Sequence, residues 1–205
     1  MNVDGTHYRS LWWSSQAAAL QIIDQRWLPH ELRIQTVDTL RDFYEAIAQM
    51  HVRGAPLIGA TAAYGVALGM KIDPSDQHLD DVAGQLAATR PTAINLHWAI
   101  NRAQSVLQPL PATQRAQAAL ALAHQMAEED VETNRQLGEH GARLIEALAA
   151  NQPAGQPVNI LTHCNAGWLA TVDWGTATSP MFQAHDAGVN IHIWVDETRP
   201  RNQGR

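Results

Sequence analysis

The chain has 205 residues, of which 45% are hydrophobic and 17% are charged, as expected for a globular protein with a buried core and not for a disordered one. Its net charge of -6 argues against a general nucleic-acid binder, which needs a clustered basic surface. The most apolar uncharged stretch, residues 54–70, is short for a membrane helix, and no signal-peptide pattern opens the chain. We therefore predict a cytoplasmic protein with no membrane partner and with one large or two small domains.

The basic residues are thirteen Arg and a single Lys, Lys71. Arg is the better bidentate ligand for phosphate or carboxylate, although a GC-rich coding bias explains the same excess. The chain also has a single cysteine, Cys164, which excludes an internal disulfide and a Cys-based zinc cluster. Its thiol is either an inert buried group or a reactive one.

The N-terminal region contains three candidate strands, at residues 8–13, 20–27 and 31–37, with Pro29 as a natural turn residue between the last two. They predict a small antiparallel sheet. A helix is expected over residues 36–50, because apolar side chains recur there at helical spacing and Asp38 or Thr39 can cap its first turn.

Helices dominate the next hundred residues. The helix expected over residues 55–70 is apolar on all sides and should lie buried in the middle of a bundle, where its glycines allow close helix packing. Further helices are expected at about 74–88, 95–107, 113–128 and 130–150. The last of these carries an apolar stripe that we expect to face the core, formed by Leu137, Leu144, Ile145 and Leu148.

A linker with two Pro and one Gly, residues 151–157, separates a mainly helical region from one in which strands and a helix alternate. We place the domain boundary here, with one domain over residues 1–150 and a second over residues 151–205. The second begins with two expected buried strands, 158–162 and 191–195, joined by a small-residue turn and a helix that starts near 176–179 and ends near Gly188. This order is typical of a parallel α/β sheet, so the fold class is α/β.

Two arginines precede expected helix starts. Arg53 is followed by Gly54, Ala55 and Pro56, so a bound anion could meet the unpaired N–H groups and the favourable dipole of a helix N-terminus. Arg90 precedes the helix expected at 95–107 and could bind the same anion. The alternative is that both are ordinary loop arginines beside a Pro turn.

A third cluster, residues 162–167, follows the first strand of the expected parallel sheet, where open α/β sheets bind ligands. The small residues after Cys164 leave room for a ligand above the sulfur. His163 should point to the opposite face and is a poor candidate to activate that thiol. The polar run 196–200 ends the second strand, so both clusters should face one crevice. The absence of a G-x-G-x-x-G motif leaves a dinucleotide cofactor without support.

In their order and spacing these stretches resemble the methylthioribose-1-phosphate isomerase family of methionine salvage. The wider superfamily includes the regulatory subunits of the exchange factor for eukaryotic initiation factor two, and the Cys164 turn favours the isomerase branch. The resemblance covers nearly the whole chain through Ile23–Arg26 with Leu28-Pro29, Met50–Gly69, Arg90–Ala99, Leu161–Gly175 and Asp196–Gly204.

The resemblance implies an N-terminal domain with a small antiparallel sheet and a helical bundle, followed by the first part of a Rossmann-like parallel α/β domain. It implies a homodimer that converts 5-methylthioribose 1-phosphate to 5-methylthioribulose 1-phosphate without metal or cofactor. Cys164 would be the catalytic thiol, and the substrate-binding residues would be Arg53, Gly54, Ala55, Arg90 and Gln203.

The resemblance also implies a catalytic Asp and an Asn-Lys pair in a downstream segment that this chain lacks. We therefore expect a C-terminally truncated isomerase with little or no turnover. One alternative is a non-catalytic sugar-phosphate or nucleotide-binding protein of the initiation factor 2B regulatory type. Another is a fragment without function of its own, in which the strand at 191–195 would leave an apolar face and edge exposed.

Overall fold

The computed structural model describes residues 1–196. It begins with a two-residue hairpin of β1 (Asn2–Val3) and β2 (Thr6–His7), followed by an antiparallel sheet in the order β3 (Leu11–Ser14), β4 (Ala19–Ile23) and β5 (Ile34–Val37). In the central strand, Leu20 pairs with Val37 and Ile22 with Leu11, and all four of these side chains are buried. The predicted small antiparallel sheet is confirmed.

The central strand is shorter than expected, because the chain turns after Ile23. The Asp24 N–H donates to the Arg33 carbonyl, and the Asp24 carboxylate accepts two hydrogen bonds from the Arg26 guanidinium, at 2.9 and 2.7 Å. The bond to Arg33 continues the pairing of β4 with β5 by one residue, and the bonds from Arg26 hold the turn in which the strand ends.

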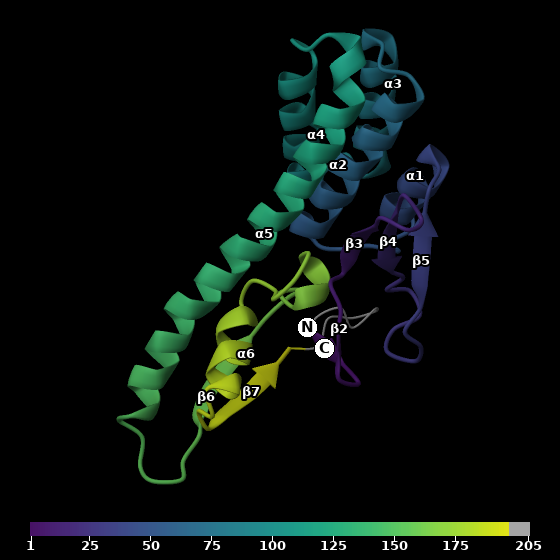
Figure 1. Cartoon of the computed structure of the whole chain (residues 1–205). Helices are drawn as coiled ribbons and strands as arrows, with labels where there is room; N and C mark the ends of the chain where they lie inside the picture. The colour runs from purple at the N-terminus through teal and green to yellow at the C-terminus, as the bar shows by residue number, and fades with distance from the viewer. Residues whose placement is uncertain (197–205) are drawn as a thin grey trace. The chain divides into compact units, whose positions relative to one another are not determined.

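Four helices follow, α1 (Leu40–Ala48), α2 (Ala55–Ile72), α3 (Asp76–Thr89) and α4 (Ile94–Leu107). Thr39 caps α1 in a reciprocal capping box with Asp42, which confirms one of the two predicted caps. The apolar helix α2 is in the middle and contacts α1, α3 and α4 (Figure 1). By length and composition it could cross a membrane, but 72% of it is buried inside the protein, as expected for a core helix.

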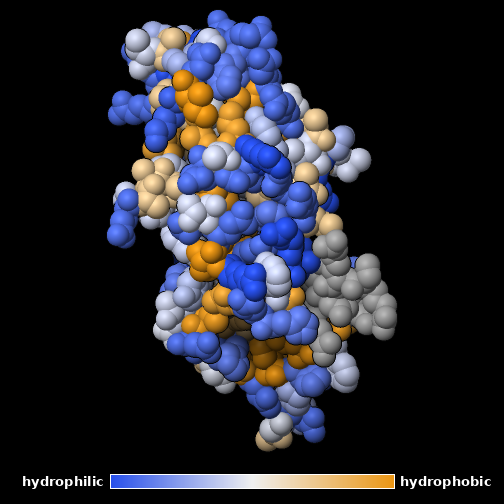
Figure 2. Space-filling model, turned by 90° about the vertical axis from the view of Figure 1, so that its right-hand side faces the viewer, coloured by the Kyte–Doolittle hydropathy of each residue, from blue (hydrophilic) through white to orange (hydrophobic). Residues whose placement is uncertain are grey.

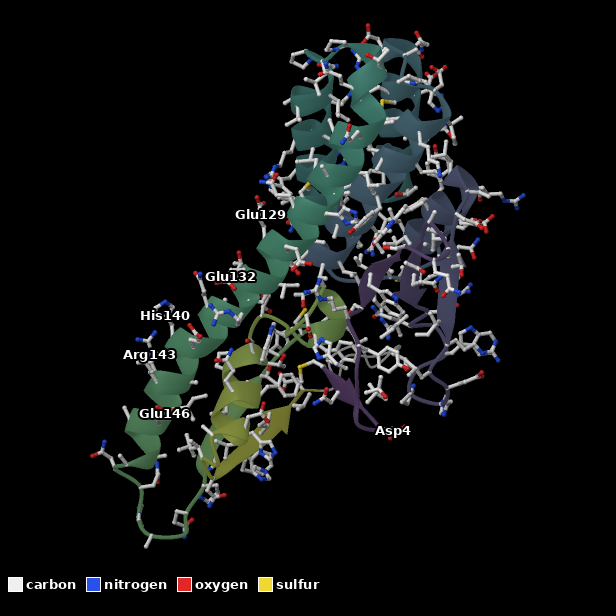
Figure 3. The ribbon with its side chains drawn as sticks, viewed as in Figure 1. Asp4, Glu129, Glu132, His140, Arg143 and Glu146 are labelled. Atoms are coloured by element: carbon white, nitrogen blue, oxygen red, sulfur yellow. The ribbon has the colours of Figure 1, made fainter. Side chains whose placement is uncertain are left out.

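The segment predicted as two helices is one helix, α5 (Ala112–Ala149), of 38 residues. The expected break at residues 129–130 contains neither Gly nor Pro. The carboxylate of Asp130 does not end the helix, because it accepts hydrogen bonds from the Asn134 side chain at 3.1 Å and from the Val172 N–H at 2.7 Å. Figure 3 shows the polar residues Glu132, His140, Arg143 and Glu146 along the outside of this helix.

The predicted core stripe of α5 is wrong for three of its four members. Ile145 is buried, whereas Leu137, Leu144 and Leu148 are exposed, Leu144 by 70%. Ile145 packs in a small core with Ala142, Val158 and Ala184. The stripe prediction used helical spacing alone, and spacing does not say which apolar side of a helix a neighbour covers.

The chain divides into two compact units, one formed by residues 9–129 and the other by residues 1–8 with 130–205. This division lies within α5, whereas the domain boundary expected from the sequence lies at residue 150, in the loop that follows the helix. The division into domains 1–150 and 151–205 stays a prediction.

The second unit contains β6 (Val158–Thr162), a 3-10 turn at Trp168–Ala170, α6 (Ser179–Asp186) and β7 (Ile191–Val195). The two strands pair in parallel, with Leu161 opposite Trp194, which confirms the predicted parallel α/β unit. The expectation that both strands are buried is wrong for the described residues. One side of the pair packs on the core around Ile145, but Leu161, Ile193, Trp194 and Val195 are exposed, and Figure 2 shows apolar surface in this part of the molecule.

Candidate functional site

The N-terminus of α2 is built to accept an anion. Gly54 precedes it with φ 111° and ψ 140°, a conformation that side chains other than glycine rarely adopt. Gly54 has no side chain that could cap the helix, so the first turn has no acceptor from its N-cap residue. Arg53 stands directly before this turn and is 8% exposed. The arrangement places a buried guanidinium beside the positive end of a helix dipole.

Two polar residues that the sequence reasoning did not single out surround Arg53. Gln25 is buried, and its side-chain oxygen accepts a hydrogen bond from Arg53 Nε at 3.2 Å. The Gln25 N–H donates in turn to the His51 carbonyl at 2.9 Å. Gln25 thereby links the loop after β4 to the segment that leads into α2, and it orients the Arg53 side chain.

The imidazole of His51 is buried, and one of its two nitrogens forms a hydrogen bond. Its Nδ1 lies 2.8 Å from Gln35 Oε1, an acceptor, so Nδ1 carries the hydrogen. Its Nε2 is buried and has no hydrogen-bond partner among the described residues. Burial, helped by the nearby charge of Arg26, lowers the pKa of His51, which keeps the ring neutral at pH 7. Nε2 is therefore an acceptor without a donor.

The carboxylate of Asp24 keeps its charge at this end of the unit. Burial by itself raises the pKa of Asp24, but the hydrogen bonds and the charge of Arg26 outweigh it, and the net pKa lies below its ordinary value. The Trp27 indole N–H also donates to this carboxylate, at 3.2 Å. Arg26 is thus neutralised by Asp24.

Arg90 lies at the same end of the helical bundle as Arg53. A Cβ placed on Gly59, in the second turn of α2, would lie 3.0 Å from the carbonyl oxygen of Asn95 in the first turn of α4. The second turn of α2 therefore touches the first turn of α4, at the end of the bundle where both helices begin. Arg90 is half-buried, and no hydrogen bond or ion pair joins its side chain to the rest of residues 1–196. Its guanidinium is available to an anion.

Cys164 lies in the other compact unit, at the turn after β6. Its thiol is exposed, and its φ of 67° is in the left-handed region that favours glycine. The loop behind it is folded tightly on itself, because a Cβ on Gly175 would lie 2.6 Å from the backbone of Gly167 and Trp168. A strained backbone held by close packing is a feature of functional turns.

The carboxyl ends of β6 and β7 lie side by side, as predicted. The Asp196 N–H donates to the Thr162 carbonyl at 3.2 Å, and His163 Nδ1 lies 2.8 Å from Asp196 Oδ2. The partner of His163 is therefore a carboxylate on the neighbouring strand. The hydroxyl of Thr162 is buried and has no partner among the described residues.

Arg53, Gly54 and Ala55 lie at the start of α2, and Arg90 follows the end of α3, all within residues 9–129. Cys164 occupies the strand ends of the second unit, and Gln203 lies outside the described residues 1–196. Two features of the sequence could have pointed to Gln25 and His51. Gln25 belongs to a polar pair, Asp24-Gln25, directly after an apolar strand, and His51 lies two residues before Arg53.

The family model of the Initiation factor 2 subunit family matches residues 51–205. Two curated methylthioribose-1-phosphate isomerases, from Brucella anthropi and Rhodospirillum rubrum, are each 56% identical to the chain over its whole length, which is 56% and 53% of their own. The chain thus spans about half the length of the curated relatives it matches.

Two solved structures share the fold over 97% of this chain. One is 5-methylthioribose 1-phosphate isomerase from Pyrococcus horikoshii, with a TM-score of 0.81, 35% identity and 55% of that chain covered. The other is the delta subunit of translation initiation factor eIF-2B from A. fulgidus, with a TM-score of 0.80, 40% identity and 57% of that chain covered. With the family model matched over residues 51–205, the chain belongs to the Initiation factor 2 subunit family.

Proposed function

We propose that the protein is an aldose–ketose isomerase that converts 5-methylthioribose 1-phosphate to 5-methylthioribulose 1-phosphate. The observation that carries the proposal is the placement of Arg53 and Arg90 before two helices that touch near their starts, the second turn of α2 against the first turn of α4. Such a pair suits a sugar phosphate, and the identity with the curated isomerases supports the substrate.

In this proposal the phosphate is held by the guanidinium groups of Arg53 and Arg90 and by the N–H groups of the first turn of α2. Charge-assisted bonds of this kind are shorter and stronger than bonds between neutral groups. Gly54 lets the phosphate approach the backbone, since it carries no side chain at the helix entrance. Gln25 acts as a positioning residue, because it holds Arg53 Nε.

The chemistry requires ring opening and the transfer of one hydrogen. The bond between C1 and the ring oxygen breaks, the ring oxygen gains a proton, and the C2 hydroxyl loses one as C2 becomes a ketone. The hydrogen on C2 moves to C1, either as a proton through an enol or as a hydride. Substrate and product are isomers, so no oxidant or reductant is consumed. Cys164 is the proposed acid or base for the proton steps.

The remaining parts of the proposal concern the setting of the enzyme. The active form is a homodimer in the cytoplasm, and the reaction uses no metal and no organic cofactor. Gln203 is a further proposed contact to the substrate, which the resemblance to the isomerases supports. Sedimentation velocity at several protein concentrations tests the dimer directly.

Conversion of 5-methylthioribose 1-phosphate by the purified chain, followed by carbon NMR of the new ketone, tests the activity. Calorimetry with the same sugar phosphate tests the proposed binding of the phosphate. We expect Arg90→Gln to weaken binding by about tenfold to a hundredfold, as for the loss of one charge-assisted bond. Arg41→Gln, which removes an exposed charge on α1, should leave binding unchanged. We expect Cys164→Ser to keep binding and lose conversion.

The second candidate function is a non-catalytic sugar-phosphate or nucleotide sensor of the initiation factor 2B regulatory type. The family match and the 40% identity to the eIF-2B delta subunit favour it. Calorimetry with nucleotides separates the two candidates: Arg90-dependent binding of a nucleotide in preference to the sugar phosphate would support the sensor and contradict the isomerase. Absence of binding would contradict both.

A further inference from the structure

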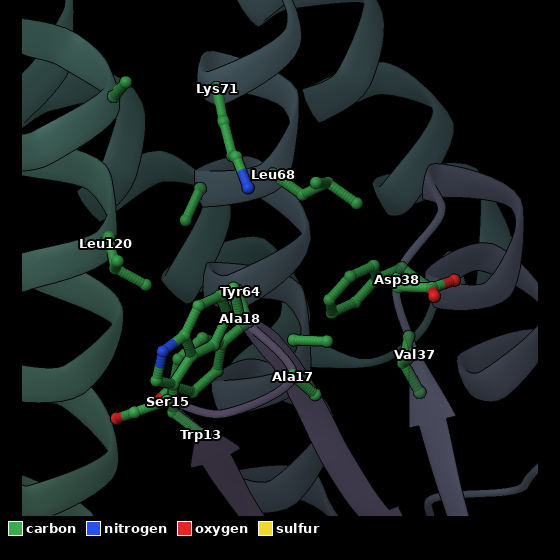
Figure 4. Close-up of a pocket in the computed structure, with 14 residues that line it drawn as sticks. Trp13, Ser15, Ala17, Ala18, Val37, Asp38, Tyr64, Leu68, Lys71 and Leu120 are labelled. Carbon is green, nitrogen blue, oxygen red and sulfur yellow. The ribbon is translucent and has the colours of Figure 1, made fainter.

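A cavity of about 550 Å³ lies within residues 9–129, away from Arg53 and Arg90, which we call the arginine pair. Figure 4 shows it between the β3–β4 turn, the end of β5 and the helices α1, α2 and α5. Its volume is in the range of small-molecule sites, about 300–1,000 Å³. It faces the second half of α2, near Leu68, which at about 1.5 Å per residue is about 20 Å from the helix start at Ala55.

The walls of this cavity are mainly apolar. Phe43, Leu68 and Leu120 line it together with several alanines. Trp13 stacks on Tyr64 with ring centroids 5.8 Å apart and an interplanar angle of 9°, which forms a flat aromatic wall. A rigid apolar site of this shape accepts a flat or branched hydrocarbon body.

The aromatic wall adds no charge to the cavity. The Tyr64 hydroxyl lies 2.9 Å from Nδ1 of His124, and burial, with the nearby charge of Glu128, raises the pKa of Tyr64 to about 12. The phenol is therefore neutral at physiological pH, and its position is held from the far side by the imidazole.

One cationic side chain borders the cavity, and it is Lys71, the single lysine of the chain. No hydrogen bond or ion pair joins it to any other residue in the described range 1–196. Figure 4 shows its ammonium directed toward the cavity, whereas the carboxylate of Asp38 points away from it. An unpaired ammonium over an apolar chamber attracts the acidic head of an amphipathic molecule.

We propose that this cavity binds a small organic carboxylate, with its single negative charge on Lys71 and its apolar body against the Trp13–Tyr64 wall. One ammonium matches one negative charge, so a monoanion fits better than a doubly charged phosphate. The proposal is independent of the isomerase reaction, because the arginine pair is at the other end of α2.

Calorimetry with three probes of one shape tests the proposal: naphthoate, naphthylmethanol and naphthylmethylamine. We expect naphthoate to bind about twofold to fivefold tighter than the neutral and the cationic probe, as for the contribution of an exposed ion pair. Lys71→Gln should remove the preference, and Arg41→Gln, the loss of a positive charge elsewhere, should keep it. Equal affinity for the three probes, or a preference that survives Lys71→Gln, would overturn the proposal.

A second measurement uses the single lysine. Acetylation removes its charge and reductive methylation keeps it, and both reagents also modify the N-terminal amine. Naphthoate should bind the methylated protein as it binds the parent, and its affinity for the acetylated protein should fall by about twofold to fivefold. Ala116→Phe, which fills the cavity from α5, should abolish binding of all three probes while urea unfolding shows that the variant is folded. Unchanged naphthoate binding by the acetylated protein, or by a folded Ala116→Phe variant, would contradict binding in this cavity.

Discussion

The contact between α2 and α4 can be tested with one methyl group. Alanine at Gly59 would place its Cβ 3.0 Å from the carbonyl oxygen of Asn95 and 3.6 Å from the Cβ of Ala99. The carbonyl is backbone and cannot rotate away, so the two helices must separate by a few tenths of an ångström. Overpacking of this kind costs about 1–3 kcal/mol. Alanine in place of glycine in a helix returns about 0.5–1 kcal/mol, so a net loss of about 1 kcal/mol is expected.

Gly84→Ala is the matched control. Gly84 is inside α3, and a Cβ there would meet nothing within 4 Å, so this variant keeps the helix benefit without the clash. It should be more stable than the parent by about 0.5–1 kcal/mol. The two variants should therefore differ by about 1–3 kcal/mol, which is the overpacking cost alone.

Urea unfolding followed by far-UV circular dichroism measures both variants. The expected order of midpoints is Gly84→Ala, then the parent, then Gly59→Ala. Calorimetry with the sugar phosphate adds a functional readout, because separation of the two helix starts moves Arg53 away from Arg90. A Gly59→Ala protein as stable as Gly84→Ala would refute the close approach and, with it, the argument that the two arginines share one end of the bundle.

Three further predictions concern the same fold. Asp24→Asn should lower the urea midpoint at pH 7, because it breaks the ion pair with Arg26. The pKa of Asp24 is lowered in the folded state, so the carboxylate stabilises the fold above its ordinary pKa of 3.8. The difference in midpoint between variant and parent should therefore shrink as the pH falls below 3.8. Leu144→Gln should change the free energy of unfolding by less than about 0.5 kcal/mol, whereas Ile145→Ala should cost about 2–4 kcal/mol; equal losses would contradict the burial of α5. Thr39→Ala should cost about 1 kcal/mol through the loss of the α1 cap, measured in the same urea assay, with no change as the contrary result.

Local chemistry made much of the fold predictable. Thr39 is one of two caps predicted for α1, and such a cap is predictable because its side chain acts on a backbone N–H only three residues away. The buried helix α2 was predicted because it is apolar on every side, so any packing arrangement buries it. The parallel strands β6 and β7 were recognised from short β-branched runs separated by a helix.

Predictions that depended on distant neighbours failed or were not made. Two helices were predicted where α5 is continuous: Asp130 bonds to Val172, 42 residues away, and the helix continues. Leu144 has the spacing of a core residue, yet in the described structure it is exposed, because the neighbouring elements cover the other side of the helix. No periodicity could have shown this.

For the candidate site the division is similar. The sequence by itself determined the residue types and their order: Arg53 and Gly54 before one helix, Arg90 before another, and Cys164 after a strand. Only the tertiary structure decided that Gln25 holds Arg53, that the second turn of α2 touches the first turn of α4, and that Lys71 borders an apolar cavity. The physical reason is that helix starts and turns follow from neighbours along the chain, whereas contacts between helices and the walls of a cavity depend on side chains that folding brings together from distant positions.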